Sequence, residues 1–164
     1  MGAVDSHNTI VLTPAPAGRF LEGLLDVTTS LKPGHLMAIK AATEPVGGRH
    51  TWTKYEGTAG HRTLIAILLE NEMVGLTCED AISDGQRIRL YCPIPGDELL
   101  VRVSAAGTGT GDALAIGDKV IASNDGTFKA NTGSPESEPF IVMETVADVT
   151  ASPGDLVHVM FTGF

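Results

Sequence analysis

Cysteine and metal-binding patterns are scarce in this chain. Cys78 and Cys92 do not form a CxxC pair, and no second pair completes a zinc site. We therefore expect two reduced, half-buried thiols, although a disulfide between them is possible. The five histidines show neither HxH nor HxxxH spacing. His50 and His61 could meet across a hairpin, but we interpret them as exposed strand residues. The sequence predicts no metal and no cofactor.

Positive charge and long apolar runs are also scarce. The chain has 11 Lys and Arg against 20 Asp and Glu, a net charge of −9, with a pI near 4.8. Such a surface repels nucleic-acid phosphates and anionic membranes, so neither is expected as a partner. No run has membrane-spanning length, and the N-terminus lacks the basic start and apolar core of a signal peptide. We expect a soluble protein made in a cytoplasm.

Catalytic motifs are missing too. No serine lies in a GxSxG setting, and "GTGTGD" lacks the Lys-Ser/Thr ending of a phosphate-binding loop. The acidic stretch of Glu70, Glu72, Glu79 and Asp80 has no EF-hand spacing, so we interpret it as a solvated turn. We expect no enzyme. A small β-barrel enzyme or a cofactor carrier stays as an alternative, with Lys129 the nearest carrier lysine, although its flanking residues do not match that pattern.

Glycine and proline, in contrast, are plentiful. With 19 Gly, 9 Pro and only 19% charged residues, the composition favours short strands joined by tight turns. A Gly, a polar residue and an alternating apolar run recur in "KPGHLMAIK", "SDGQRIRLYC", "IPGDELLVRV", "IGDKVIAS" and "SPGDLVHVMFTGF". Gly supplies the positive φ of a turn, and the polar side chain bonds back to its backbone. These phrases predict turns before strands, and "SNDGTF" predicts a hairpin.

The apolar alternation predicts which side chains of each strand face inward. In "RIRLYC" it directs Ile88, Leu90 and Cys92 inward and Arg87, Arg89 and Tyr91 outward; in "ELLVRVS" it directs Leu99, Val101 and Val103 inward and Arg102 outward. "FLEGLLDVTTS" and "RTLIAILLE" are compatible with strand or helix. Strands every ten to fifteen residues predict a mostly β fold, a small β-barrel or β-sandwich-like domain with at most one or two short helices. Residues 1–20 are expected to form an extended N-terminal arm and residues 21–164 the β-rich domain.

Residues 60–164 contain "TLIAILLENEMVGLTCEDAISDGQRIRLYCPIPGDELLVRV", followed by "GDKVIASNDGTFKAN", "PFIVMETV" and "PGDLVHVMF". In these stretches the chain resembles the head decoration (capsid cement) proteins of tailed bacteriophages. The resemblance implies a structural protein of the virion, bound to the major capsid protein on the outside of an expanded head. It further implies a homotrimer at local three-fold axes that stabilises the capsid against internal DNA pressure. A carbohydrate- or receptor-binding β module on a particle surface is the alternative of a different class.

The resemblance also suggests contact residues. In the arm, Ile10, Val11 and Leu12 are candidates for adding a strand to a capsid sheet. Phe20 and Leu21 are candidates for anchoring the arm. Trp52 and Tyr55 are candidates for a subunit contact because aromatic side chains dominate interfaces, with a plain core position as the alternative for Trp52.

Overall fold

The computed structural model describes residues 10–12, 18–40, 47, 49–55, 64–71, 75–104, 113–123, 125–130, 140–146 and 155–163. These residues form ten strands joined by turns and contain no helix. The prediction of a mostly β fold with a barrel is therefore confirmed. Both ambiguous segments are strands, since "FLEGLLDVTTS" contributes β1 and "RTLIAILLE" contributes β4.

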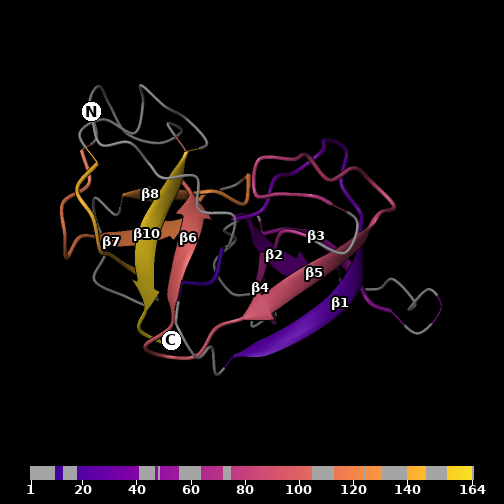
Figure 1. The fold of residues 1–164 in the computed structure, drawn as a ribbon, viewed down its shortest axis with the longest axis horizontal. Helices are drawn as coiled ribbons and strands as arrows, with labels where there is room; N and C mark the ends of the chain where they lie inside the picture. The colour runs from indigo at the N-terminus through magenta and orange to yellow at the C-terminus, as the bar shows by residue number, and fades with distance from the viewer. Residues whose placement is uncertain are drawn as a thin grey trace.

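The first half of the chain forms a closed five-stranded barrel (Figure 1). Leu21 and Gly23 of β1 pair with Leu90 and Ile88 of β5, and these pairs face the interior. The strands are β1 (Arg19–Leu25), β2 (Leu36–Ile39), β3 (Thr51–Lys54), β4 (Ile65–Leu68) and β5 (Arg87–Cys92), in the spatial order β1-β3-β2-β4-β5. The interior is filled by Leu25, Leu31, Met37, Trp52, Ala66, Leu68, Ile82, Ile88 and Leu90.

The second half forms a five-stranded antiparallel sheet beside the barrel (Figure 1). Its strands are β6 (Glu98–Arg102), β7 (Lys119–Ala122), β8 (Phe128–Ala130), β9 (Phe140–Val142) and β10 (Leu156–Phe161), in the order β6-β10-β9-β7-β8. The sheet curls, because Val103, just after β6, bridges to Phe128 of β8, and Ser104 N donates to Phe128 O over 2.8 Å. The concave face therefore encloses a dry core of valines, leucines and three phenylalanines, Phe128, Phe140 and Phe161.

The repeated Gly-polar phrases are turns, as predicted. Gly34, Gly85, Gly96 and Gly117 have φ values of 95°, 74°, 98° and 93°, the left-handed region that glycine tolerates best. After three of them the next side chain accepts the N–H of the residue three positions earlier: Gln86 from Ser83, Asp97 from Ile94 and Asp118 from Ala115. The fifth phrase has its turn outside the described residues. Gly126 has a φ of 80°, and β7 pairs with β8 as the hairpin prediction requires.

Two residues predicted to face outward are buried, so that part of the prediction is wrong. Tyr91 is 0% exposed and Arg102 is 4% exposed. The alternation placed Tyr91 on the outer face of the barrel correctly, since it pairs with Phe20 and Ile67 rather than with interior residues. That outer face, however, is covered by the second sheet: Leu36, Ile67 and Tyr91 of the barrel belong to the same core cluster as the sheet. One shared core joins the two halves.

Candidate interaction surface

The predicted strand-adding segment lies on the chain's own sheet. Val11 forms an antiparallel bridge with Leu99, Leu12 N donates to Glu98 O over 2.8 Å, and Leu100 N donates to Ile10 O over 2.8 Å. Ile10 is 0% exposed, and its N–H donates to the Glu70 carboxylate over 3.1 Å. Residues 10–12 therefore extend the β6 edge of the sheet. Addition of this segment to another protein remains a prediction.

Gly18 is held against the barrel by a polar link through Tyr91. Gly18 N donates to the Tyr91 hydroxyl over 2.9 Å, and that hydroxyl donates to Asp97 Oδ2 over 2.6 Å. Burial, and next the bond to Asp97, raise the pKa of Tyr91 to about 12. Phe20, one of the predicted anchors, lies with its ring centroid 5.0 Å from that of Tyr91 and is 51% exposed. The other predicted anchor, Leu21, packs against the barrel core.

Trp52 is a core residue, the alternative given for it above. It is 1% exposed, inside the barrel. Its indole lies so close to Gly23 that a Cβ at that glycine would be 2.3 Å from Trp52 Cδ1. Tyr55 is half-buried and packs against the other cluster, the core of the sheet. The structure therefore does not bring Trp52 and Tyr55 together on one surface.

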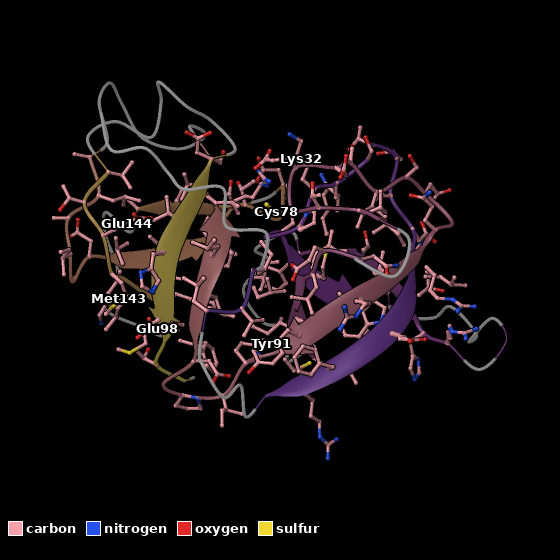
Figure 2. The ribbon with its side chains drawn as sticks, viewed as in Figure 1. Lys32, Cys78, Tyr91, Glu98, Met143 and Glu144 are labelled. Carbon is pink, nitrogen blue, oxygen red and sulfur yellow. The ribbon has the colours of Figure 1, made fainter. Side chains whose placement is uncertain are left out.

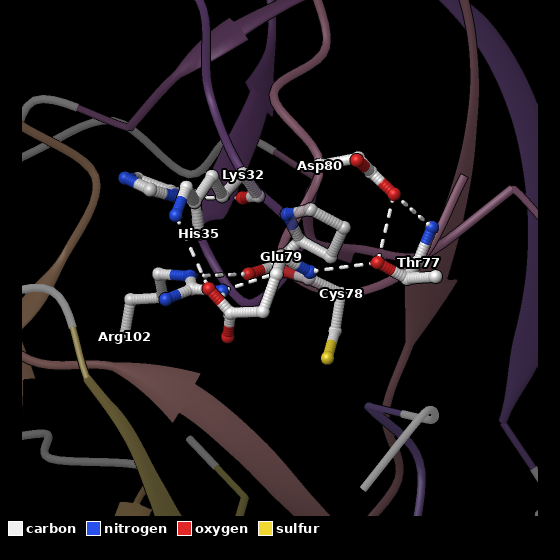
Figure 3. A network of polar contacts seen from close by, with 8 residues as sticks. Lys32, His35, Thr77, Cys78, Glu79, Asp80 and Arg102 are labelled. Atoms are coloured by element: carbon white, nitrogen blue, oxygen red, sulfur yellow. Dashed lines mark hydrogen bonds and ion pairs between the residues drawn. The ribbon is translucent and has the colours of Figure 1, made fainter. Parts of the chain in front are cut away.

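A second polar network, built on Arg102, ties the sheet to loops of the barrel (Figure 3). Arg102 Nε donates to Pro33 O over 2.9 Å, and Nη2 donates to Cys78 O over 2.5 Å and to Glu79 Oε1 over 3.1 Å. Glu79 in turn pairs with Lys32 at 3.1 Å. The acidic stretch thus has separate roles inside the chain: Glu70 binds the Ile10 amide, Glu79 binds Arg102, and Asp80 caps the turn at Thr77; Glu72 lies outside the described residues.

Three arginines gather on the outer face of the barrel. Because the pairs Leu21–Leu90 and Gly23–Ile88 point inward, the alternating pairs Glu22–Arg89 and Leu24–Arg87 point outward. The Arg89 guanidinium carbon lies 6.0 Å from the Phe20 ring centroid, and Arg49 Nε lies 3.7 Å from Glu22 Oε2. We call Phe20, Glu22, Arg49, Arg87 and Arg89 the arginine face. The alternation predicted Arg87 and Arg89 outward; Phe20 joins them only through the β1–β5 register.

An acidic surface lies on the convex side of the sheet. His158 Nε2 is 2.9 Å from Glu98 Oε2, and His158 N donates to Glu144 Oε1 over 2.6 Å. Met160 pairs with Glu98 across β10 and β6, and Met143 N donates to His158 O. Figure 2 shows Glu98, Met143 and Glu144 together on this half of the molecule. We call Glu98, Met143, Glu144, His158 and Met160 the glutamate face.

A small polar hollow of about 190 Å³ lies at the end of β1 and β3. Its lining is entirely of charged, threonine and valine residues: Asp26, Val27, Thr28, Thr29, Lys40, Thr53 and Lys54. Asp26 and Lys40 already form an ion pair at 2.7 Å. The hollow therefore offers hydroxyl groups and one further lysine, without an aromatic platform in its lining.

The described part of the chain holds no group of three or more His, Cys, Asp or Glu that could bind a metal. Cys78 and Cys92 are both free thiols, as expected, and burial raises the pKa of each. Lys129, the carrier candidate, lies within β8 opposite Ile121 rather than at the turn. Within the same described ranges no helix is long and apolar enough to span a bilayer. His61 lies outside them, so its predicted approach to His50 is not described.

Comparison with known proteins gives a similarity of fold to a solved structure. No family model matches the chain, and no curated protein matches it. Among solved structures, its fold is similar to that of the N base of the head fiber gp8.5 in bacteriophage phi29, with a TM-score of 0.53 and 12% sequence identity. The alignment covers 88% of this chain and 94% of that chain. At this identity the similarity concerns the fold, and it extends over both the barrel and the sheet.

Proposed function

We propose that this chain is a structural protein of a bacteriophage head, a decoration (cement) protein. It binds the major capsid protein on the outside of the expanded head, as trimers at local three-fold axes, and stabilises the shell against internal DNA pressure. The observation that carries the proposal is the fold shared with a head fiber base over 88% of this chain and 94% of the other. The decoration-protein resemblance of residues 60–164 supports the same role independently.

The direct test is co-sedimentation of the purified chain with expanded, undecorated heads of its own virus, with the bound copies counted. The expected result is saturation at a multiple of three copies per local three-fold site. Heads carrying the chain should also retain their DNA to a higher temperature than bare heads. Absence of binding at both low and moderate salt would contradict the proposal, and binding to glycans instead would favour the carbohydrate-binding alternative.

Variants of the N-terminal arm test its role in head binding. Gly18 and Phe20 are part of the barrel, through the bond to Tyr91 and through β1, so a deletion reaching residue 20 would damage the fold. Deletion of residues 1–12 leaves that link in place but removes Ile10, which is 0% exposed in the core of the sheet and donates to Glu70, so the segment on the β6 edge is tested by substitution instead. If this segment holds the shell, Val11→Ser/Leu12→Ser, which keeps Ile10, abolishes head binding while Trp52 fluorescence and the amide hydrogen exchange of Val157 stay native. Deletion of residues 1–9 is the matched control, because it keeps Ile10, Val11 and Leu12.

A second candidate is the base of a head appendage, in which the chain carries another structure on the capsid instead of strengthening it. The similarity to a fiber base favours this candidate specifically, because the alignment covers 94% of that chain. The two roles differ in one measurement. A cement protein raises the temperature at which expanded heads release DNA, whereas an appendage base binds the heads and leaves that temperature unchanged.

A further inference from the structure

Charge is divided unevenly between the two halves of the molecule. Residues 18–92, which include the barrel, contain 8 Lys and Arg and 9 Asp and Glu, a net charge of −1. Residues 93–164, which include the sheet, contain 3 Lys and Arg and 10 Asp and Glu, a net charge of −7. One of those three cations, Arg102, is buried in the junction. The sheet half is therefore strongly negative, and the barrel half is nearly neutral.

Within the barrel half, the arginine face concentrates positive charge. Glu22 lies 3.7 Å from Arg49 in a loose, exposed pair and opposite Arg89 across β1 and β5, and Arg87 lies two residues before Arg89 on the same side of β5. Beside them Phe20 is 51% exposed, a large apolar side chain left in solvent by this chain. Arginine and aromatic side chains, phenylalanine included, are enriched at protein interfaces relative to the rest of the surface. A partner for this face must supply carboxylates and apolar contact together.

The glutamate face has both carboxylates and apolar side chains. Its carboxylates are held on either side of β10, Glu98 by the His158 ring and Glu144 by the His158 backbone N–H, so both have fixed positions. Met143 and Met160 lie beside them, half-buried, and methionine packs readily against aromatic rings. This face lies on β6, β10 and the residues after β9, in the sheet, whereas the arginine face lies on β1, β5 and Arg49, in the barrel (Figure 1).

We propose that the arginine face of one copy docks on the glutamate face of a second copy. The contact is head-to-tail, since it joins two different surfaces, and such contacts close into rings when the rotation between copies allows it. Complementary charge would steer the encounter and fix the register, and Phe20 against Met143 and Met160 would supply the apolar centre. This inference stands apart from head binding: a chain that binds no capsid can still associate in this way.

The test is charge reversal with complementation, read by sedimentation-velocity ultracentrifugation. Arg87→Glu/Arg89→Glu makes the arginine face negative, and Glu98→Arg/Glu144→Arg makes the glutamate face positive. Each double variant alone should lose self-association by about 100-fold or more, because like charges then oppose each other at every contact. Mixing the two variants should restore association, since each reversed face then meets a reversed partner. The chain carrying all four substitutions should self-associate for the same reason.

Controls separate this contact from a general effect of charge. Lys54→Glu/Lys129→Glu changes the net charge as much as the arginine reversal but lies outside both faces, and it should associate like the parent chain. Association of the parent chain should weaken in about 1 M salt, where the screening length falls to about 3 Å. Trp52 fluorescence confirms that the barrel of each variant is folded, and amide hydrogen exchange of Val157 and Val159 confirms the sheet. A monomeric parent chain, or a mixture that fails to associate, overturns the proposal. So does arginine reversal that abolishes head binding and leaves self-association intact.

Discussion

Tyr91 is the residue through which the start of the barrel is fixed to the start of the sheet. Its hydroxyl accepts a hydrogen bond from Gly18 N and donates one to Asp97, and neither Tyr91 nor Asp97 is more than 3% exposed. Asp97 also accepts the Ile94 N–H of the turn between the halves. A buried carboxylate that loses a donor is destabilised, because water cannot replace the missing hydrogen bond.

Tyr91→Phe should therefore lower the free energy of unfolding by about 1–3 kcal/mol at neutral pH. The substitution should also change how the free energy of unfolding depends on pH above about pH 10. An unfolded tyrosine ionises near pH 10, whereas folded Tyr91 keeps its proton to about pH 12. Between these values the folded state binds more protons, so the parent chain loses about 2 kcal/mol as the pH rises, and the variant is spared that loss. Urea unfolding at pH 8, 10 and 11.5 measures both effects; equal slopes for parent and variant would contradict the assignment.

Arg102 is the second residue on which the junction depends. Arg102→Met keeps most of the side chain's volume but leaves Pro33 O and Cys78 O without the donor they have now. We expect a loss of about 3 kcal/mol, and Arg102→Lys should recover little, because a single ammonium cannot reproduce the guanidinium's spread of donors. Arg87→Met, on the open arginine face, is the matched control and should change stability by less than about 0.5 kcal/mol. Equal losses of unfolding free energy in Arg102→Met and Arg87→Met would show that the Arg102 network does not stabilise the fold.

Tyr91 and Arg102 show what apolar alternation can and cannot predict about burial. The alternation assigned Tyr91 to the outside of the barrel, and the pairing with Phe20 and Ile67 agrees. Alternation reports the face on which a side chain lies, not what covers that face. Because the second sheet packs on the barrel's outside, a residue can be outward in its own strand and buried in the molecule. Arg102 is the same case, with loops of the barrel as its cover.

At the scale of elements, the turns were the most predictable part of the fold. A Gly-polar pair restricts the backbone locally, so Gly96–Asp97 and Gly117–Asp118 form turns for reasons contained in four residues. The strand partners were not predictable in the same way. That β1 pairs with both β3 and β5, and that residues 10–12 extend the β6 edge, depends on contacts between segments far apart in sequence. The arginine face follows from that register, which explains why Phe20 was not grouped with Arg89.

One strand contact is tight enough to test directly. Gly23 in β1 lies against Trp52 of β3, and a Cβ there would be 2.3 Å from Trp52 Cδ1 and 2.6 Å from Nε1. Gly23→Ala should therefore lower the free energy of unfolding by about 1–3 kcal/mol through overpacking. Trp52→Phe removes the larger ring system, together with an Nε1 that has no hydrogen-bond partner in the structure. In the Trp52→Phe background, Gly23→Ala should lower the free energy of unfolding by about 1 kcal/mol less than it does in the parent chain. A double-mutant cycle measured by urea unfolding gives this difference. Strict additivity would show that the barrel relaxes around the methyl group.

At the scale of the whole molecule, the described strands of the barrel and of the sheet share no ladder, but the two halves are joined by packing and by hydrogen bonds of loop and side-chain groups. No described strand of the barrel pairs with a described strand of the sheet. The core cluster of the sheet nevertheless includes Leu36, Ile67 and Tyr91 of the barrel. Ile10 belongs to it as well, although it precedes the barrel in sequence. Neither half can therefore lose its structure without exposing apolar surface of the other.

Unfolding should accordingly be a single cooperative transition. Trp52, the chain's one tryptophan, reports on the barrel, and amide hydrogen exchange of Val157 and Val159 reports on the sheet. The two probes should give the same midpoint in urea, since small domains with one core unfold in two states. Arg102→Met weakens the junction without dividing the shared core, so it should lower both midpoints together. Two midpoints in the parent chain would mean that the halves fold independently. In that event the shared core would contribute little, and the sheet could be replaced or extended without loss of the barrel.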